Sequence, residues 1–117
     1  MTAATTLELL DRFTEALNAH DLDAVMALVT DDIVFESTSP APDGTRYEGR
    51  SDVAQVWGDL LSTTPNAHFT VEEQFCIGPD RAIVRWRYDW DGGHVRGVDV
   101  DRVRDGKLCE SLAYVKG

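Results

Sequence analysis

Apolar residues in the first half of the chain recur every three to four positions, which is the period of an α-helix. Residues 5–8 read Thr-Thr-Leu-Glu and fit a capping box, followed by Leu9, Leu10, Phe13 and Leu17 on one helical face. Asp21 suits the N-cap of a second helix, and Ser51 that of a third helix, which Pro65 ends. We predict that the later two helices bury Leu22, Val25, Met26, Val29, Val53, Val56, Trp57, Leu60 and Leu61.

Beyond Pro65 the period becomes two, which indicates β-strands. Turn residues at 78–80, 91–93 and 105–106 separate strands predicted near 67–77, 81–90, 94–104 and 107–115. A short strand is expected at 33–35, and a loop rich in Pro and Gly at 37–49. The order of helices followed by strands predicts one α+β domain over residues 1–117, with three N-terminal helices packed on one face of an antiparallel sheet.

The predicted hairpin from 81 to 104 places carboxylates on an aromatic face. Ala82, Val84, Trp86, Tyr88 and Trp90 occupy alternate positions, so they share one side of their strand, whereas Ile83 and three charged residues point to the other side. A two-residue turn at either 91–92 or 92–93 puts Asp99 and Asp101 on that side, because the two registers differ by two residues. With the turn at 92–93, Trp86 faces Asp99 and Asp89 faces Arg96. A three-residue turn would send both acids outward.

A buried carboxylate without a partner is costly, so an acid on this face implies a pocket that holds solvent or ligand. Asp99 is therefore the candidate catalytic residue. Asp101 is expected to line the pocket in a structural role, either solvated at a sheet edge or hydrogen-bonded to Tyr or Trp groups. The three histidines are scattered along the chain and have no ligand-like spacing, so no metal site is predicted.

Composition narrows the possible partners. The formal net charge of −10 argues against nucleic acid, because phosphate binding needs a basic surface. No apolar run approaches the roughly 18 residues of a membrane helix, and the first residues lack the pattern of a signal peptide. Cys76 and Cys109 are far apart and are interpreted as reduced thiols, so a cytoplasmic location is expected.

Four segments of the chain resemble a known family. Residues 13–23, 28–35 and 47–50, and Val-Asp-Val-Asp-Arg-Val-Arg-Asp-Gly-Lys-Leu at 98–108, look like the SnoaL-like branch of the nuclear transport factor 2-like superfamily. Ketosteroid isomerases and SnoaL-type polyketide cyclases belong to the same superfamily. The resemblance implies a cone-shaped, strongly curved sheet with a cystatin-like roll around a deep pocket. It also implies a homodimer across the outer sheet face.

Only one of the three catalytic positions of ketosteroid isomerases keeps its residue type in this chain. The general-base Asp of those isomerases falls on Ser37, with Glu36 beside it, and their oxyanion-hole Tyr falls on Phe13. Their protonated Asp falls on Asp99. A standard ketosteroid isomerase is therefore not expected. The Arg-x-Asp of limonene epoxide hydrolases matches residues 87–89, but the later Asp of those enzymes falls on Ala113 and the alternation sends Arg87 outward, so that activity is rejected.

Together these features predict a protein that binds a small apolar molecule in its pocket. We expect a cofactor-independent acid/base enzyme of the isomerase, cyclase or hydratase type, acting on a small apolar or aromatic substrate, with Asp99 as the acid/base. The alternative is a non-catalytic ligand-binding or dimerisation module. The predicted pocket residues, besides Asp99 and Asp101, are Phe13, Phe35, Tyr47, Trp57, Trp86, Tyr88, Trp90 and Tyr114.

The direction of three side chains or roles stays open from the sequence. Whether Glu110 and Tyr114 face the pocket depends on the length of the turn near Asp105 and Gly106, and Glu36 has no clear role.

The outer face of the sheet is predicted to form a homodimer interface. Val98 and Val100 form a small apolar centre there, and charged residues surround it, as is common at protein interfaces. These residues are Arg85, Arg87, Arg96 and Arg102.

Overall fold

Three helices occupy the N-terminal half of the chain, as the apolar period predicted. In the computed structural model, which describes residues 2–116, they are α1 (Ala3–Asn18), α2 (Leu22–Met26) and α3 (Arg50–Thr63). Helix α1 begins earlier than predicted, because Thr2 is its N-cap and shares a capping box with Thr5. Helix α3 begins after Gly49 rather than at a Ser51 cap.

Six strands form a single sheet in the order β2-β1-β6-β5-β4-β3. Strands β3 (His68–Cys76), β4 (Arg81–Trp90), β5 (Gly93–Arg104) and β6 (Lys107–Val115) form the predicted antiparallel meander. Strand β1 (Val29–Glu36) is longer than predicted and runs parallel to β6. Strand β2 (Arg46–Glu48) lies inside the segment predicted to be a loop. The sheet is therefore antiparallel except for one pair.

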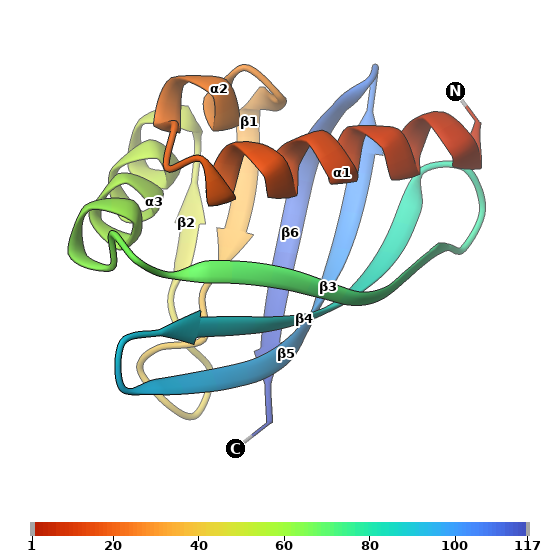
Figure 1. The fold of residues 1–117 in the computed structure, drawn as a ribbon. Coiled ribbons are helices and arrows are strands. Elements are labelled where there is room, and N and C mark those ends of the chain that lie inside the picture. The colour runs from red at the N-terminus through yellow and green to blue at the C-terminus, as the bar shows by residue number, and fades with distance from the viewer. Residues whose placement is uncertain (1, 117) are drawn as a thin grey trace.

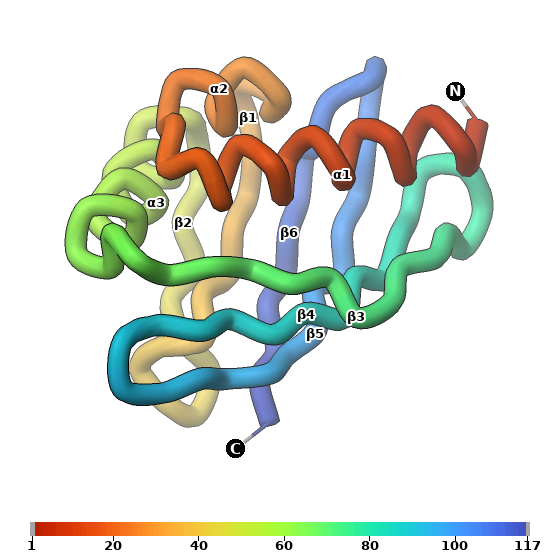
Figure 2. Tube along the Cα trace, in the orientation of Figure 1, coloured from red at the N-terminus to blue at the C-terminus, as the bar shows by residue number. Residues whose placement is uncertain are grey.

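The sheet is strongly curved and does not close. Strands β1 and β6 run down the view in Figure 1, whereas β3 runs across it, and α1 lies over the concave side. The trace in Figure 2 shows the same arrangement, with α3 beside β1 and β2. Register shifts leave one extra residue in β3, at Glu72, and one in β6, at Cys109, and such bulges bend a strand. The predicted cone-shaped α+β fold is confirmed.

Side-chain hydrogen bonds hold α1 over the sheet. The Asn18 amide, at the end of α1, donates to the Phe69 carbonyl and accepts from the Phe69 N–H, at 2.9 and 2.7 Å. At the other end of α1, the buried Thr6 hydroxyl donates to the Pro79 carbonyl at 2.6 Å. These two contacts attach both ends of the helix to the β3–β4 hairpin. The space beneath α1 is thereby covered.

The β4–β5 turn is the two-residue turn Asp91–Gly92, one of the two alternatives. Trp86 therefore pairs with Gly97, and Asp99 pairs with Val84. The cross-strand pairing expected for a 92–93 turn is wrong. Asp89 faces His94 and forms its ion pair with Arg87 on its own strand, at 3.0 Å. Because the two registers differ by two residues, the aromatic face and the two aspartates still share one side.

Candidate functional site

A cavity of about 370 Å³ lies between α1, α3 and the concave face of the sheet. Its volume falls within the range of small-molecule sites, which is about 300–1,000 Å³. Its walls are mostly apolar, and a short polar stretch comes from the loop after β1. The lining residues are Leu10, Phe13, Thr14, Leu17, Phe35, Ser37, Thr38, Ser39, Val56, Trp57, Leu60, Phe69, Val71, Val84, Trp86, Tyr88, Val95, Asp99, Asp101, Ser111 and Ala113.

The structure brings most of the sequence-predicted residues to this cavity. They come from two helices and from the sheet. Helix α1 supplies Phe13 and α3 supplies Trp57, whose rings meet edge to face at 5.3 Å. Strand β1 supplies Phe35, and the central strands supply the rest, namely Trp86, Tyr88, Asp99 and Asp101. Aromatic rings and two acids thus share one enclosed space.

Three predicted pocket residues do not line the cavity. Tyr47 lies on the edge strand β2 and stacks against Phe35, with ring centroids 6.2 Å apart. Trp90 is the last residue of β4, and its indole lies over Gly93 beside the turn, where it is 39% exposed. Tyr114 points to the outer face and is 55% exposed. These placements correct the prediction.

The bulge at Cys109 decides which residues of β6 face the cavity. The turn at Asp105–Gly106 has two residues, and Val103 pairs with Leu108. Beyond the bulge Arg102 pairs with Glu110, so Glu110 and Tyr114 turn outward. Ser111 and Ala113 take the inward positions, which sequence reasoning missed. No residue type in this segment signals the extra residue in advance.

Asp99 is hydrogen-bonded within the cavity wall. Its Oδ1 accepts from the indole Nε1–H of Trp86 at 3.0 Å. The carboxyl is buried, and Asp99 as a whole is half-buried and lines the cavity. Burial raises the pKa of Asp99 to about 7, and the Trp86 hydrogen bond opposes part of this rise. Near neutral pH this group can therefore both accept and return a proton.

A glycine opposite Trp86 makes that hydrogen bond sterically possible. Gly97 is the cross-strand partner of Trp86, and a Cβ at position 97 would lie 2.6 Å from the indole ring. It would also collide with the Tyr114 carbonyl on β6. The indole therefore lies across β5 in space that a side chain would otherwise occupy. Sequence reasoning did not single out Gly97.

Asp101 is the more deeply buried of the two acids. It is 4% exposed, and its Oδ1 has no hydrogen-bond partner among residues 2–116. Burial, together with the nearby charge of Asp99, raises the pKa of Asp101 well above its ordinary value, while the Ser111 hydroxyl opposite it favours ionisation. Burial and the Asp99 charge thus both favour the protonated form of Asp101.

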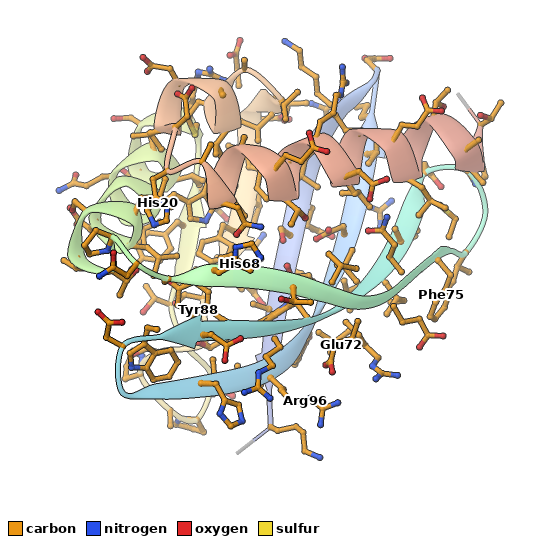
Figure 3. All side chains as sticks on the ribbon, viewed as in Figure 1. His20, His68, Glu72, Phe75, Tyr88 and Arg96 are labelled. Atoms are coloured by element: carbon orange, nitrogen blue, oxygen red, sulfur yellow. The ribbon has the colours of Figure 1, made fainter. Side chains whose placement is uncertain are left out.

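Other polar candidates are engaged elsewhere. Tyr88, which Figure 3 labels, lines the cavity, but its hydroxyl is hydrogen-bonded to the Thr64 hydroxyl. Glu36 lies away from the cavity and pairs with Arg46 at 2.9 Å. The His20 ring contacts the Thr64 carbonyl, where α3 ends. Across residues 2–116, no cluster of three or more His, Cys, Asp or Glu side chains is arranged to hold a metal ion.

No helix in the described part of the chain is both long and apolar enough to cross a bilayer.

Fold and cavity together define an α+β domain of the nuclear transport factor 2-like class. A solved NTF2-like protein of unknown function from Mesorhizobium loti is 42% identical, with a TM-score of 0.86 over 98% of this chain and 93% of that one. The chain belongs to the SnoaL-like domain family, whose model matches residues 10–111. The predicted resemblance is confirmed. No curated protein matches the chain.

Two more distant structures have names that mention a reaction. A candidate ketosteroid isomerase from Kribbella flavida is 20% identical, with a TM-score of 0.83 over 98% of this chain and 80% of that one. A candidate polyketide cyclase from Sinorhizobium meliloti is 19% identical, with a TM-score of 0.79 over 92% of this chain and 94% of that one. At such identities the likeness establishes the fold and not the reaction.

Proposed function

We propose that this protein is a cofactor-independent acid/base enzyme that moves a proton at carbon in a small apolar or aromatic molecule bound in the cavity. The proposed acid/base is Asp99. The reaction type is that of an isomerase, cyclase or hydratase, all of which need a proton taken from or given to carbon. The candidate isomerase and cyclase of the same fold are consistent with this class.

The single observation that supports this proposal most is the environment of Asp99. A carboxyl that titrates near pH 7 is matched to proton transfer under neutral conditions. The Trp86 N–H holds one oxygen, which leaves the other free to meet a ligand. The apolar walls exclude water and would strengthen any electrostatic interaction with a bound molecule. An inert scaffold has no need of a carboxyl in such a place.

A non-catalytic ligand-binding module is the second candidate. Ser37 and Phe13 occupy the positions that match the base and the phenol of ketosteroid isomerases, and both line the cavity. Neither side chain can replace the missing group, because a serine hydroxyl is a poor base and a phenyl ring has no proton to donate. This candidate predicts ligand binding without proton exchange.

Deuterium exchange into a simple ketone tests the proposal without knowledge of the natural substrate. The probe is 4-phenylbutan-2-one in D₂O at pH 8, with loss of the hydrogens beside the carbonyl followed by NMR. The wild-type protein should accelerate exchange, and Asp99→Asn should reduce the rate by about 10²–10⁴-fold. Asp89→Asn is the matched control, because Asp89 lies on the outer face. An equal rate in Asp99→Asn would remove Asp99 as the base.

We also propose that two copies associate through the outer face of the sheet. Apolar side chains gather there on the three central strands, namely Ile83, Val98, Val100, Leu112 and Tyr114. Ion pairs surround them, including Arg85 with Glu73 and Arg96 with Glu72. An apolar centre with a polar rim is typical of protein interfaces. Sedimentation of a monomer at micromolar concentration would contradict this assembly.

A further inference from the structure

The cavity holds acids without the cations that accompany acids elsewhere in the sheet. On the outer face, Glu72 pairs with Arg96 at 3.0 Å. Asp99 and Asp101 line the cavity, and no Lys, Arg or His side chain is among the described residues that line it with them. A buried charge without a partner is costly, so an ionised carboxylate there favours a partner of opposite charge. Such a partner has to come with a bound molecule.

Asp99 is the acid that a bound molecule can contact. Its Oδ1 accepts the indole N–H of Trp86, and its Oδ2 has no hydrogen-bond partner among residues 2–116. Oδ2 is also not one of the fully enclosed polar atoms of the described chain, whereas the unpartnered Oδ1 of Asp101 is enclosed and lies out of reach. A molecule in the cavity therefore meets the Oδ2 atom of Asp99.

Aromatic rings form much of the cavity wall. The aromatic lining residues are Phe13, Phe35, Trp57, Phe69, Trp86 and Tyr88. The Phe69 ring meets the Trp86 ring edge to face at 5.7 Å, so the aromatic wall extends from the residue that holds Asp99. The face of an aromatic ring carries partial negative charge and attracts a cation within about 6 Å. Rings together with a carboxylate favour a ligand that is both apolar and cationic.

Resting on the proposed function, which uses the same cavity and the same acid, we infer that the ligand is an apolar or aromatic molecule with a cationic nitrogen that pairs with the Asp99 carboxylate. The two chemical classes that fit are a protonated amine and an iminium ion. An anionic ligand is disfavoured, because it would meet two acids in a protein of net charge −10. A neutral ligand would leave the charge of Asp99 without a partner.

A cationic nitrogen also suits proton transfer at carbon. In an iminium ion, the C=N⁺ bond makes the hydrogens of the neighbouring carbon acidic. The Asp99 carboxylate takes one of these protons, the electrons of the C–H bond form a C=C bond, and the π electrons of the C=N bond become the lone pair of nitrogen. The products are a neutral enamine and protonated Asp99, so two opposite charges disappear together in an apolar cavity. Return of the proton to carbon restores the starting state, and no co-reactant is consumed.

Two ligands with one carbon skeleton test the charge preference by binding alone. At pH 8, 4-phenylbutan-2-amine is cationic and 4-phenylbutan-2-ol is neutral, and calorimetric titration measures both affinities. The amine should bind at least tenfold more tightly than the alcohol, and Asp99→Asn should bring that ratio close to one. Asp89→Asn, the matched control on the outer face, should leave the ratio unchanged. Absence of amine binding, equal binding of the two ligands, or a ratio that survives Asp99→Asn would overturn the inference.

The pH dependence of amine binding provides a test that needs no variant. The amine pairs with ionised Asp99, whose pKa is raised to about 7, so its affinity should fall by about thirtyfold between pH 8 and pH 5.5. The titratable side chains of the lining are Asp99 and Asp101 on β5 and Tyr88 on β4. Protonation of Asp101, whose pKa is also raised by burial, acts in the same direction. An amine affinity that is unchanged or higher at pH 5.5 would contradict the pairing.

Deuterium exchange separates this inference from the proposed function. The probe is the 1,2-dimethyl-3,4-dihydroisoquinolinium cation, whose permanently charged C=N⁺ bond activates the hydrogens of the methyl group on C1. Relative to buffer, the wild-type protein should accelerate exchange of this methyl group in D₂O by a larger factor than exchange into 4-phenylbutan-2-one. A larger factor for the ketone would overturn the inference and leave the proposed function intact. Absence of acceleration for both probes would overturn the proposed function alone, because the preference for the amine is measured independently by binding.

Discussion

Carboxyl groups on the two faces of the sheet have pKa values that are shifted in opposite directions. On the concave face, no described Lys, Arg or His side chain pairs with Asp99 or Asp101, and burial raises both pKa values. On the outer face, Glu72 pairs with Arg96 at 3.0 Å, and that hydrogen bond lowers the pKa of Glu72. Figure 3 labels both members of this outer pair. The surroundings, and not the residue type, decide whether the pKa of a carboxyl lies above or below its ordinary value.

Stability as a function of pH should show the largest difference between the faces. The folded protein keeps a proton on Asp99 that the unfolded chain releases near pH 4, so stability falls as the pH rises from about 4 to 7. A pKa raised from 3.8 to about 7 corresponds to about 4 kcal/mol. Urea unfolding between pH 4.5 and 8 measures this loss. Asp99→Asn should remove the share that Asp99 contributes, and Asp101, whose pKa is also raised by burial, should leave a slope of the same sign. An unchanged slope in Asp99→Asn would contradict the burial of this charge.

Glu72 should show the opposite sign. Its pKa is lowered in the folded state, so the stability it contributes is present above the ordinary carboxyl pKa and is lost as the pH falls. Glu72→Gln is therefore the matched comparison for Asp99→Asn in the same unfolding experiment.

Removal of the Trp86 indole N–H should change the free energy of unfolding by less than the pH change does. Trp86→Phe deletes the donor to Asp99, whose pKa should rise further because that hydrogen bond favours the charged form. The lost bond to a charged group should cost about 1.5–3 kcal/mol above pH 7. Carbon-13 NMR titration of the aspartate carboxyls measures the pKa. Trp57→Phe is the control, because Trp57 is also a tryptophan that lines the cavity, but it belongs to α3 and the hydrogen bond to Asp99 comes from Trp86.

The outer ion pair should contribute least. Arg96→Ala removes the partner of Glu72 from a pair whose side chains are 39% and 28% exposed. Solvent screens such pairs, so the free energy of unfolding should change by less than about 1 kcal/mol. Added salt should reduce the difference further. A loss of several kcal/mol would mean that the outer face is buried by another molecule under the conditions of the measurement.

Much of the fold followed from local patterns. The change of period from 3.6 to two near Pro65 located the helices and the meander, because each element must bury one face. The side of the sheet on which Asp99 lies was predictable for a similar reason. Either two-residue turn places Asp99 with Trp86, since the registers differ by two residues.

The errors fall where a single residue interrupts the alternation. The extra residue at Cys109 reverses the facing of Tyr114 and brings Ser111 to the cavity. Trp90 alternates in step with the inward-facing residues of β4, but it lies beside the turn, where it is exposed. Asp101 was interpreted as solvated or hydrogen-bonded, and in the structure one of its oxygens is buried without a partner.

The amino-acid sequence by itself determined the class of fold, the family and the inward side of the β4–β5 hairpin, because periodicity and turn length act over a few residues. Only the tertiary structure decided how far the sheet bends, which side chains enclose the cavity and which carboxyl lacks a partner. These properties depend on the packing of α1 and α3 against strands distant in the chain. Burial is a sum over such neighbours, and no local pattern contains it.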